Sequence, residues 1–418
     1  MAQLKDDCFA HGGALTPLDV ALLALEAKLV PVVGIETVPL AEALGRIAAA
    51  DVVAGRPVPP HDNSAVDGYA VYFDDLNPGG DTRLAVTGRI AAGHPLGRPA
   101  KPGEALRIFT GAPMPDGPDT IFMQEDVTLD GDDVILPQGL KRGANHRSRG
   151  EDVTEGSVII PAGKILRPQE IGLAASVGLA FLHVHKRLRV AVFSTGDEVR
   201  DPSGEAPDGC IFDSNRFTVM GLLEQLGAAI TDLGILPDDE NIIRAALEAS
   251  SADHDLLFTS GGVSVGDEDH VKAAVESLGQ LNFWRLAIKP GRPIALGTIG
   301  GAAFIGLPGN PVAAMVTFIR VARPVVLLLA GATDITPDLY RVRAGFSYDK
   351  KTGRREWVRC RLQRGGDGVL TAHKHSSGGA GVLSSMVWAH GLVELPEDRT
   401  HVDEGETVDF LPFNGVLS

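Results

Sequence analysis

Apolar runs alternate with helix-like segments through the middle of the chain, between Leu188 and Pro311. The apolar runs have the lengths of buried strands and lie at residues 188–193, 229–236, 255–258, 281–288 and 302–307. Segments with helical spacing follow polar capping residues and lie at 215–226, 240–250 and 268–278. This alternation predicts a three-layer α/β domain with a mostly parallel sheet over residues 187–332. Because such crossovers are right-handed, the carboxyl ends of the strands meet at one edge, where open α/β sheets bind ligands.

The chain before this domain has two other patterns. Short strand-like runs separated by turns predict an inserted β domain at residues 57–152, with strands at 84–91, 105–109, 120–127 and 133–136. The flanking segments, 1–56 and 153–186, predict one discontinuous α+β linking domain. Its expected elements are helices at 17–30, 38–50 and 168–176 and a hairpin-like segment at 157–166.

The last third of the chain completes the expected fold. A long apolar helix is expected from Pro311 to about Leu329, with a kink at Pro324. Alternating apolar and polar residues with glycine-rich turns predict a C-terminal β-barrel-like domain at 333–418. The expected fold class is therefore α/β plus β, in several domains.

Composition narrows the classes of function. With 418 residues the chain is too long for one core, so about two to four domains are expected. A net charge of −16 argues against nucleic acid or an anionic membrane as the partner. Three widely spaced cysteines, Cys8, Cys210 and Cys360, suit a reducing cytosol. Since no signal-peptide pattern is found and the apolar run Val325–Ala330 is too short to span a bilayer, a cytoplasmic protein is expected.

A glycine-rich loop follows the predicted strand at 255–258 and reads TSGGVSVG. Backbone N–H groups of such a loop, with the N-terminus of the next helix, can hold a phosphate group. The same loop is equally consistent with an ordinary strand-to-helix turn. The substrate-binding residues predicted here are Ser260, Gly261, Gly262, Ser264 and Gly266.

Carboxylates follow three of the predicted strands. Capping and the helix dipole account for some of them, but Asp269 is one more acid than capping requires. Two unit charges about 5 Å apart repel by about 3 kcal/mol at an effective dielectric near 20. A cluster of such acids therefore needs a cation or shifted pKa values, and carboxylate oxygens without paired His or Cys suit Mg²⁺ better than zinc. The candidate metal ligands are therefore the acids of Asp197-Glu198 and Asp238-Asp239, together with Asp269.

Positive charge is expected at the same edge. Arg285, Lys289 and Arg292 surround the predicted strand end at 288, and Pro308-Gly-Asn-Pro311 makes a rigid corner that is also explicable as pure turn chemistry. The sequence has no Ser-His-Asp arrangement and no GxxxxGK[ST] loop, which argues against a triad hydrolase and a P-loop NTPase. The edge is expected to bind an anionic, phosphate-bearing ligand together with a divalent cation.

Eight segments occur in an order that resembles one protein family: DNSAVDGYAV, RIFTGAPMP, RGEDV, FSTGDE, DSNR, SGGVSVGDED, FWRLAIKPGRP and GLPGNPV. The chain is similar to the molybdopterin molybdotransferases of molybdenum-cofactor biosynthesis, a family that includes the gephyrin E domain. The resemblance implies an elongated four-domain fold and a homodimer. It also implies that molybdate and adenylylated molybdopterin are the substrates, that Mg²⁺ assists the reaction, and that AMP is released.

The resemblance also implies roles for individual residues. Matching catalytic positions are Asp67, Thr110, Asp152, Glu198, Asp238, Asp269 and Lys289, and matching substrate-binding positions include Pro308 and Pro311. Where many family members carry a second lysine, this chain has Arg285, which keeps the positive charge but replaces the ammonium group by a planar guanidinium with several hydrogen-bond donors. Lys289, with Arg285, is expected to hold molybdate. The resemblance selects Glu198, Asp238 and Asp269 as the metal ligands, and Mg²⁺ held by some of them is expected to polarise the adenylate linkage. The group that attacks phosphorus is either water or a molybdate oxygen.

Two other functions fit parts of the sequence. An adenylyltransferase of the same pathway resembles the α/β domain alone, so the extra domains argue against it. A gephyrin-like scaffold is the second alternative, against which the catalytic acids argue; transient contact with an adenylyltransferase is compatible with the main interpretation. Since the inserted β domain is expected to project outward, it can reach a partner's sheet edge in a two-fold dimer, which predicts shared active sites.

Overall fold

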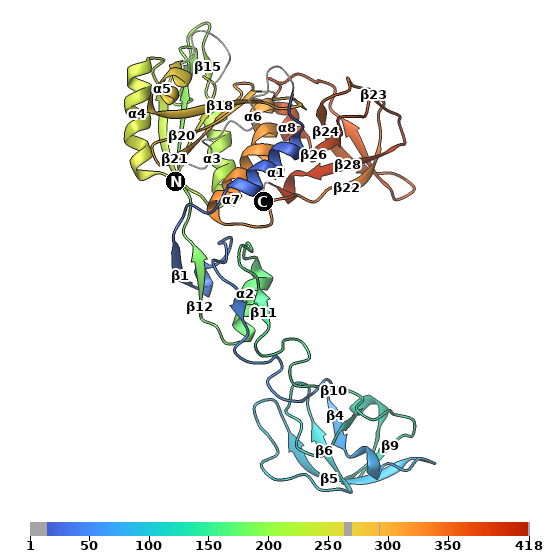
Figure 1. Cartoon of the computed structure of the whole chain (residues 1–418). Coiled ribbons are helices and arrows are strands. Elements are labelled where there is room, and N and C mark those ends of the chain that lie inside the picture. The colour runs from blue at the N-terminus through green and yellow to red at the C-terminus, as the bar shows by residue number, and fades with distance from the viewer. Residues whose placement is uncertain (1–14, 263–269, 292, 417–418) are drawn as a thin grey trace.

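A computed structural model describes residues 15–262, 270–291 and 293–416 of the chain. The molecule is elongated: the α/β domain and the C-terminal barrel lie side by side at one end, and the inserted β domain lies at the other (Figure 1). A narrow linking region of two strand pairs and one helix joins them. The predicted fold class is confirmed, since the chain combines an α/β domain with separate β domains.

A six-stranded sheet in the order β16-β13-β17-β21-β20-β18 forms the α/β domain. Four strands are parallel: β16 (Ala229–Leu236), β13 (Arg189–Thr195), β17 (Leu256–Ser260) and β21 (Ala302–Leu307). The sequence analysis missed β20 (Pro293–Ile299), which is antiparallel to both β21 and β18 (Gly279–Arg285). β18 therefore runs in the same direction as the four parallel strands. All five predicted strand ends accordingly reach one edge.

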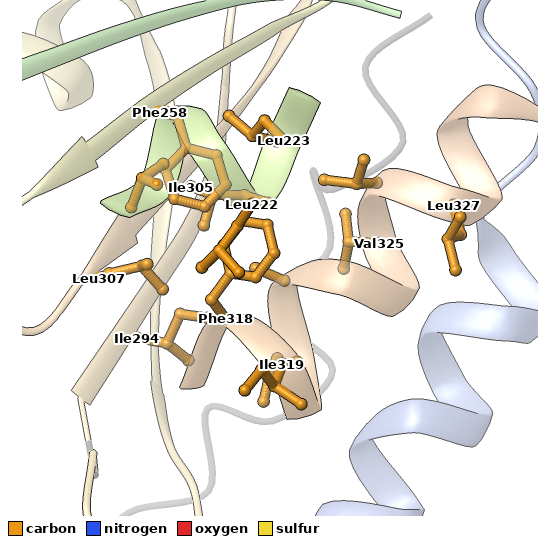
Figure 2. Packing of buried hydrophobic residues seen from close by; sticks show 14 of the residues in the cluster. Leu222, Leu223, Phe258, Ile294, Ile305, Leu307, Phe318, Ile319, Val325 and Leu327 are labelled. Carbon is orange, nitrogen blue, oxygen red and sulfur yellow. The ribbon is translucent and has the colours of Figure 1, made fainter. Parts of the chain in front are cut away.

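Helices cover both faces of this sheet. One face packs against α4 (Glu240–Asp253) and α5 (His270–Leu278). The other packs against α3 (Asn215–Gln225) and one continuous helix made of α6 (Pro311–Thr317), the π turn η4 (Phe318–Ala322) and α7 (Arg323–Ala330). Figure 2 shows Phe318 of the π turn near Phe258 and Ile305 of the sheet, and the rings of Phe318 and Phe258 are in contact. The helix Pro311–Ala330 is long and apolar enough to cross a membrane, but 83% of its most apolar window is buried inside the protein.

Two predictions for the linking region are wrong. Residues 38–50 are not a helix: β1 (Ile35–Pro39) pairs with β12 (Phe181–His185), and only the short 3-10 turn η1 (Leu40–Glu42) follows. Residues 157–166 are not a hairpin, because β11 (Val158–Ile160) pairs with the distant β2 (Val52–Val53). In both cases the partner strand comes from far along the chain. The predicted helix at 168–176 is present as α2 (Pro168–Ser176).

The first helix also lies outside the domain predicted for it. α1 (Leu18–Lys28) buries Leu18, Ala21 and Leu25 in the main core, beside α7 and the barrel, because these apolar residues fall on one face. The other domain limits, at 57–152, 187–332 and 333–418, stay predictions.

The inserted domain is built on a six-stranded sheet in the order β7-β4-β6-β5-β9-β8. Its strands are β4 (Gly68–Val71), β5 (Thr82–Ile90), β6 (Glu104–Ile108), β7 (Thr120–Met123), β8 (Thr128–Asp130) and β9 (Asp133–Leu136). Two short turns, η2 (Phe73–Asp75) and η3 (Gln124–Asp126), belong to the same domain, and β3 (Asn63–Ser64) pairs with β10 (His146–Arg147).

Five strands close the C-terminal barrel, because β24 pairs with both β25 and β26. They are β22 (Tyr340–Ala344), β24 (Arg355–Arg364), β25 (Leu370–Lys374), β26 (Gly391–Leu395) and β28 (Thr407–Pro412). Smaller elements are the pair β23 (Tyr348–Asp349) and β27 (His401–Val402), the helix α8 (Ser384–Trp388) and the turn η5 (Phe413–Gly415). The short strand β19 (Ile288–Lys289), from the α/β domain, pairs in parallel with β24 and so joins the two domains.

Replacing Phe318 by Ala is expected to lower the free energy of unfolding by about 3–5 kcal/mol, since the substitution leaves a cavity in a packed core. Phe318 is 1% exposed, and its ring centroid lies 5.7 Å from that of Phe258. Chemical denaturation measures the change. Phe181→Ala is the control, because Phe181 is 60% exposed and its loss should change stability by less than about 0.5 kcal/mol. Equal losses in the two variants would contradict this view of the core.

Candidate active site

Two adjoining cavities open at the carboxyl edge of the sheet, with volumes of about 800 and 770 Å³. Glu198, Gly261, Gly262 and Gly309 line both, so the cavities form one cleft. The first cavity lies between the α/β domain and the barrel, and the second lies under the short strands β14 (Val199–Arg200) and β15 (Ile211–Phe212). The site is thus where the strand directions predicted it.

The start of the glycine-rich loop is fixed by side chains from two other elements. Asn215, the first residue of α3, donates from Nδ2 to Ser260 Oγ at 2.8 Å and to the Gly309 carbonyl at 2.7 Å. Ser260 in turn donates to the Pro308 carbonyl at 3.3 Å. These bonds hold together the glycine loop, the Pro308–Pro311 corner and the start of α3. Asn215 was missed as a site residue, although the DSNR segment that contains it was recognised.

Gly261 and Gly262 adopt positive φ angles of 95° and 63°. A Cβ atom on Gly262 would lie 2.7 Å from Val271 Cγ2 and 2.8 Å from Thr195 Cγ2, so this loop has no room for a side chain. Both glycines face the cleft, where their backbone is accessible to a ligand. Ser264 and Gly266, also predicted to bind phosphate, lie outside the described residues.

Two of the three predicted metal ligands reach the cleft. Glu198 lines both cavities, and Asp238 lines the second and accepts a hydrogen bond from Thr195 Oγ1 at 3.3 Å. Asp269 lies outside the described residues. Within those residues, no group of three or more His, Cys, Asp and Glu side chains is arranged to hold a metal ion. The neighbouring Asp239 caps α4, because its carboxylate accepts hydrogen bonds from the Asn241 and Ile242 amides. Its role is therefore to stabilise the start of that helix.

The oxygen donors present nevertheless suit Mg²⁺. Glu198 and Asp238 form no ion pair with any described residue, so their carboxylates are available to a cation. Ser194 adds a buried hydroxyl to the same cavity, and this hydroxyl has no hydrogen-bond partner within the described part of the chain. These three groups are oxygen donors, as a hard cation requires, and His270 is a further side chain in the lining of the same cavity.

Barrel residues line the first cavity, which the sequence analysis did not predict. Arg359 is 7% exposed and donates only to neutral oxygens: the carbonyls of Gly379 and Ser377, at 2.8 and 3.1 Å, and Ser385 Oγ, at 2.9 Å. Burial lowers the pKa of this guanidinium. Lys374 and His375 line the same wall. A run such as Lys374-His-Ser-Ser377 was the available signal in the sequence.

The remaining predicted residues of the α/β edge divide into two groups. Lys289 and Pro308 line the first cavity and Pro311 lines the second, so the structure brings these three to the cleft. Arg285 is exposed and lines neither cavity, so the expectation that it holds the anion finds no support in the structure. Arg292 lies outside the described residues.

Three predicted catalytic residues lie away from this cleft. Asp67 accepts two hydrogen bonds from Thr110, from its amide and its hydroxyl, both at 2.8 Å, and these bonds lower the pKa of the Asp67 carboxyl. Both residues belong to the inserted β domain, at the opposite end of the molecule (Figure 1). Asp152 is exposed, and its amide donates to the Val58 carbonyl near the base of that domain. One chain therefore does not bring all the predicted catalytic residues together.

Fold and cleft together define a multidomain α/β protein whose candidate ligand site lies at strand ends, between a glycine loop, carboxylates and the buried Arg359. Three family models match: "MoeA N-terminal region (domain I and II)" at residues 16–178, "Probable molybdopterin binding domain" at 191–327 and "MoeA C-terminal region (domain IV)" at 341–413. A molybdopterin molybdenumtransferase of Haemophilus influenzae is 40% identical over 384 residues, covering 91% of this chain and 95% of the relative. One of Nostoc sp. is 35% identical and covers 89% of this chain and 87% of its own.

A solved structure agrees with these sequence matches. A molybdopterin biosynthesis MoeA protein from Pyrococcus horikoshii OT3 superimposes with a TM-score of 0.81 at 28% identity, over 95% of this chain and all of that one. The chain belongs to the molybdopterin molybdenumtransferase (MoeA) family.

Replacing Gly262 by Ala is expected to destabilise the α/β domain by about 1–3 kcal/mol, because the new Cβ combines a left-handed backbone with steric overlap. Thermal unfolding measures the loss. Gly234→Ala is the matched control: Gly234 has a φ of 74° in the same sheet, but its Cβ would meet nothing within 4 Å. The close packing of the glycine loop would be refuted if both variants lost the same stability.

Proposed function

We propose that this protein transfers molybdenum from molybdate to adenylylated molybdopterin and releases AMP. The observation that carries this proposal is the meeting, in one cleft, of a glycine loop, carboxylates without an ion-pair partner among the described residues, the buried Arg359 and the half-exposed Lys289. Membership of the molybdopterin molybdenumtransferase family supports the reaction class. The acidic chain thus has a local site suited to an anionic substrate, despite a net charge of −16.

The chain's own residues supply two kinds of anion contact. The glycine loop is suited to the phosphate groups at Gly262, which faces the cleft without a side chain, whereas the Gly261 amide donates to the Leu307 carbonyl at 3.1 Å and so holds the loop in place. Arg359 and Lys289 are suited to molybdate, since Arg359 is a buried cation whose hydrogen-bond acceptors are all neutral. A doubly charged oxyanion would provide the missing counter-charge and accept charge-assisted hydrogen bonds.

Mg²⁺ belongs to the proposal as the cation between the carboxylates. Glu198 and Asp238 would hold it, together with Asp269 if that residue reaches the same cavity. When bound, the ion would act as a Lewis acid on the adenylate linkage and offset its negative charge. Water and a molybdate oxygen both remain candidates for the attacking group.

Two alternatives predict different observations. An adenylyltransferase would consume ATP, whereas the proposed reaction does not. A scaffold would not need the buried Arg359 or the close-packed glycine loop, which favours an enzyme. We also propose that the protein is cytoplasmic and makes transient contact with an adenylyltransferase. Both proposals follow from the expected substrate, adenylylated molybdopterin, and not from the fold.

We further propose a homodimer with shared active sites. Asp67 and Thr110 lie at the opposite end of the chain from the cleft, so a second chain is needed if both groups act on one substrate (Figure 1). Exposed apolar side chains follow one another along α1 and β1, as expected for a self-association surface: Val20, Leu23, Val30 and Ile35.

The proposed reaction is tested by incubating the purified chain with adenylylated molybdopterin, molybdate and Mg²⁺ and measuring AMP. AMP is expected only when both Mg²⁺ and molybdate are present. Asp238→Asn should lower the rate at least about tenfold, as expected for loss of one charged group at a reacting phosphate. Asp255→Asn serves as control, because Asp255 pairs with Arg189 at the opposite end of the strands. Release of AMP without molybdate, or consumption of ATP, would reject the proposal.

The shared-site model is tested with mixed dimers. Asp67→Ala and Asp238→Ala homodimers should each be nearly inactive. In a heterodimer one interface carries both substitutions and the other carries neither, so an equal mixture should recover about one quarter of the parent activity. Mass analysis confirms that heterodimers form. If activity stays absent in mixtures that contain them, each chain does not share its site with a partner.

A further inference from the structure

Lys289 does not face the cleft as a free cation. Its Nζ donates to Glu356 Oε2 at 3.0 Å, and the hydroxyl of Tyr348 donates to the same oxygen at 3.0 Å. Lys289 belongs to β19 of the α/β domain, whereas Tyr348 and Glu356 belong to β23 and β24 of the barrel. Three elements from two domains therefore meet at one carboxylate oxygen.

The burial of this carboxylate makes the contact informative. Glu356 is 2% exposed, while the side chain of Lys289 is half exposed. A carboxylate buried at the wall of an anion site repels the anion and costs desolvation free energy, unless it serves the cation beside it. The backbone reinforces the contact, because Lys289 pairs with Glu356 in the parallel register of β19 and β24.

We infer that Glu356 is the positioning residue for Lys289: it holds the ammonium charged and aimed along the domain boundary until an anionic substrate competes for it. This inference rests on the proposed function of Lys289 and adds the barrel to the residues that control it. Tyr348 occupies the second hydrogen-bonding position of Oε2, which limits the orientations open to the carboxylate. The barrel thus determines the charge and orientation of Lys289, which the α/β domain supplies.

The electrostatics of Lys289 agree with this geometry. Partial burial lowers the pKa of Lys289, but the hydrogen bond and charge of Glu356, with Tyr348, outweigh it and leave the pKa raised. Burial, with Glu356, also raises the pKa of Tyr348, so the hydroxyl keeps its proton. Lys289 lines the first cavity of the cleft and also a separate, smaller cavity of about 390 Å³. The charged and titratable groups beside it are Asp349, Lys350, Lys351 and Arg354 in the smaller cavity, and Glu198, Arg359, Lys374 and His375 in the first.

Competitive amine labelling across pH, with mass analysis of the Lys289 peptide, tests the inference without using activity. In the parent protein Lys289 should stay charged to higher pH than an ordinary lysine. Glu356→Gln removes the charge but keeps the shape, so labelling of Lys289 at pH 9 should rise at least about threefold. Glu356→Asp should restore part of the protection. Asp367→Asn, which removes an exposed barrel ion pair with Arg343, should leave the Lys289 profile unchanged.

Activity gives a second, separable result. The alkaline limb of the AMP-release profile should move to lower pH in Glu356→Gln, because Lys289 loses its proton earlier, and should not move in Asp367→Asn. An ordinary or low titration of Lys289 in the parent protein overturns the inference even if Glu356→Gln fails to fold. An unchanged labelling profile in a folded Glu356→Gln overturns it as well. A parent protein that releases no AMP instead rejects the proposed function and leaves the labelling result standing.

Discussion

The two walls of the cleft are joined by a short parallel pairing between strand β19 of the α/β domain and strand β24 of the barrel. Ile288 and Lys289 lie in parallel register with Arg355 and Glu356, and this contact joins the α/β domain to the barrel. Arg355 strengthens the boundary, because its guanidinium contacts Asp19 of α1 at 2.6 Å and two barrel acids, Glu394 and Glu397. Together with the apolar core that Trp357, Leu392 and Leu411 share with the long helix, this boundary places the wall of Arg359 and Lys374 opposite the glycine loop.

This boundary explains a division of labour between the domains. The sheet edge supplies backbone amides and carboxylates, which suit phosphate and a hard cation. The barrel supplies the buried guanidinium of Arg359 and the carboxylate of Glu356 that accepts a hydrogen bond from Lys289. Such an arrangement would let an acidic protein bind a multiply charged anion, since the positive charge is concentrated where water is partly excluded.

The α/β domain was predictable because its signals are local. Most of its strands end in turn residues, so periodicity and spacing predicted five strand ends and the polar loops beside them, although β20 was missed. The choice of Glu198 and Asp238 among neighbouring acids came from the family resemblance. The linking region was not, since β1 finds its partner β12 more than a hundred residues later. Arg359 could not be predicted for a related reason: its importance lies in having neutral neighbours, which only the folded chain determines.

The position of the apolar helix Pro311–Ala330 has a consequence for how the protein is made. The residues that bury this helix come from both ends of the sequence, since Leu18 of α1 and Val416 after the last barrel strand belong to the same apolar core. Contacts of such long sequence separation form late and slowly. During synthesis the helix therefore leaves the ribosome before the C-terminal part of its cover exists. Until the barrel strands are made, the part of this apolar helix that they cover is therefore exposed to water, where apolar surface favours aggregation.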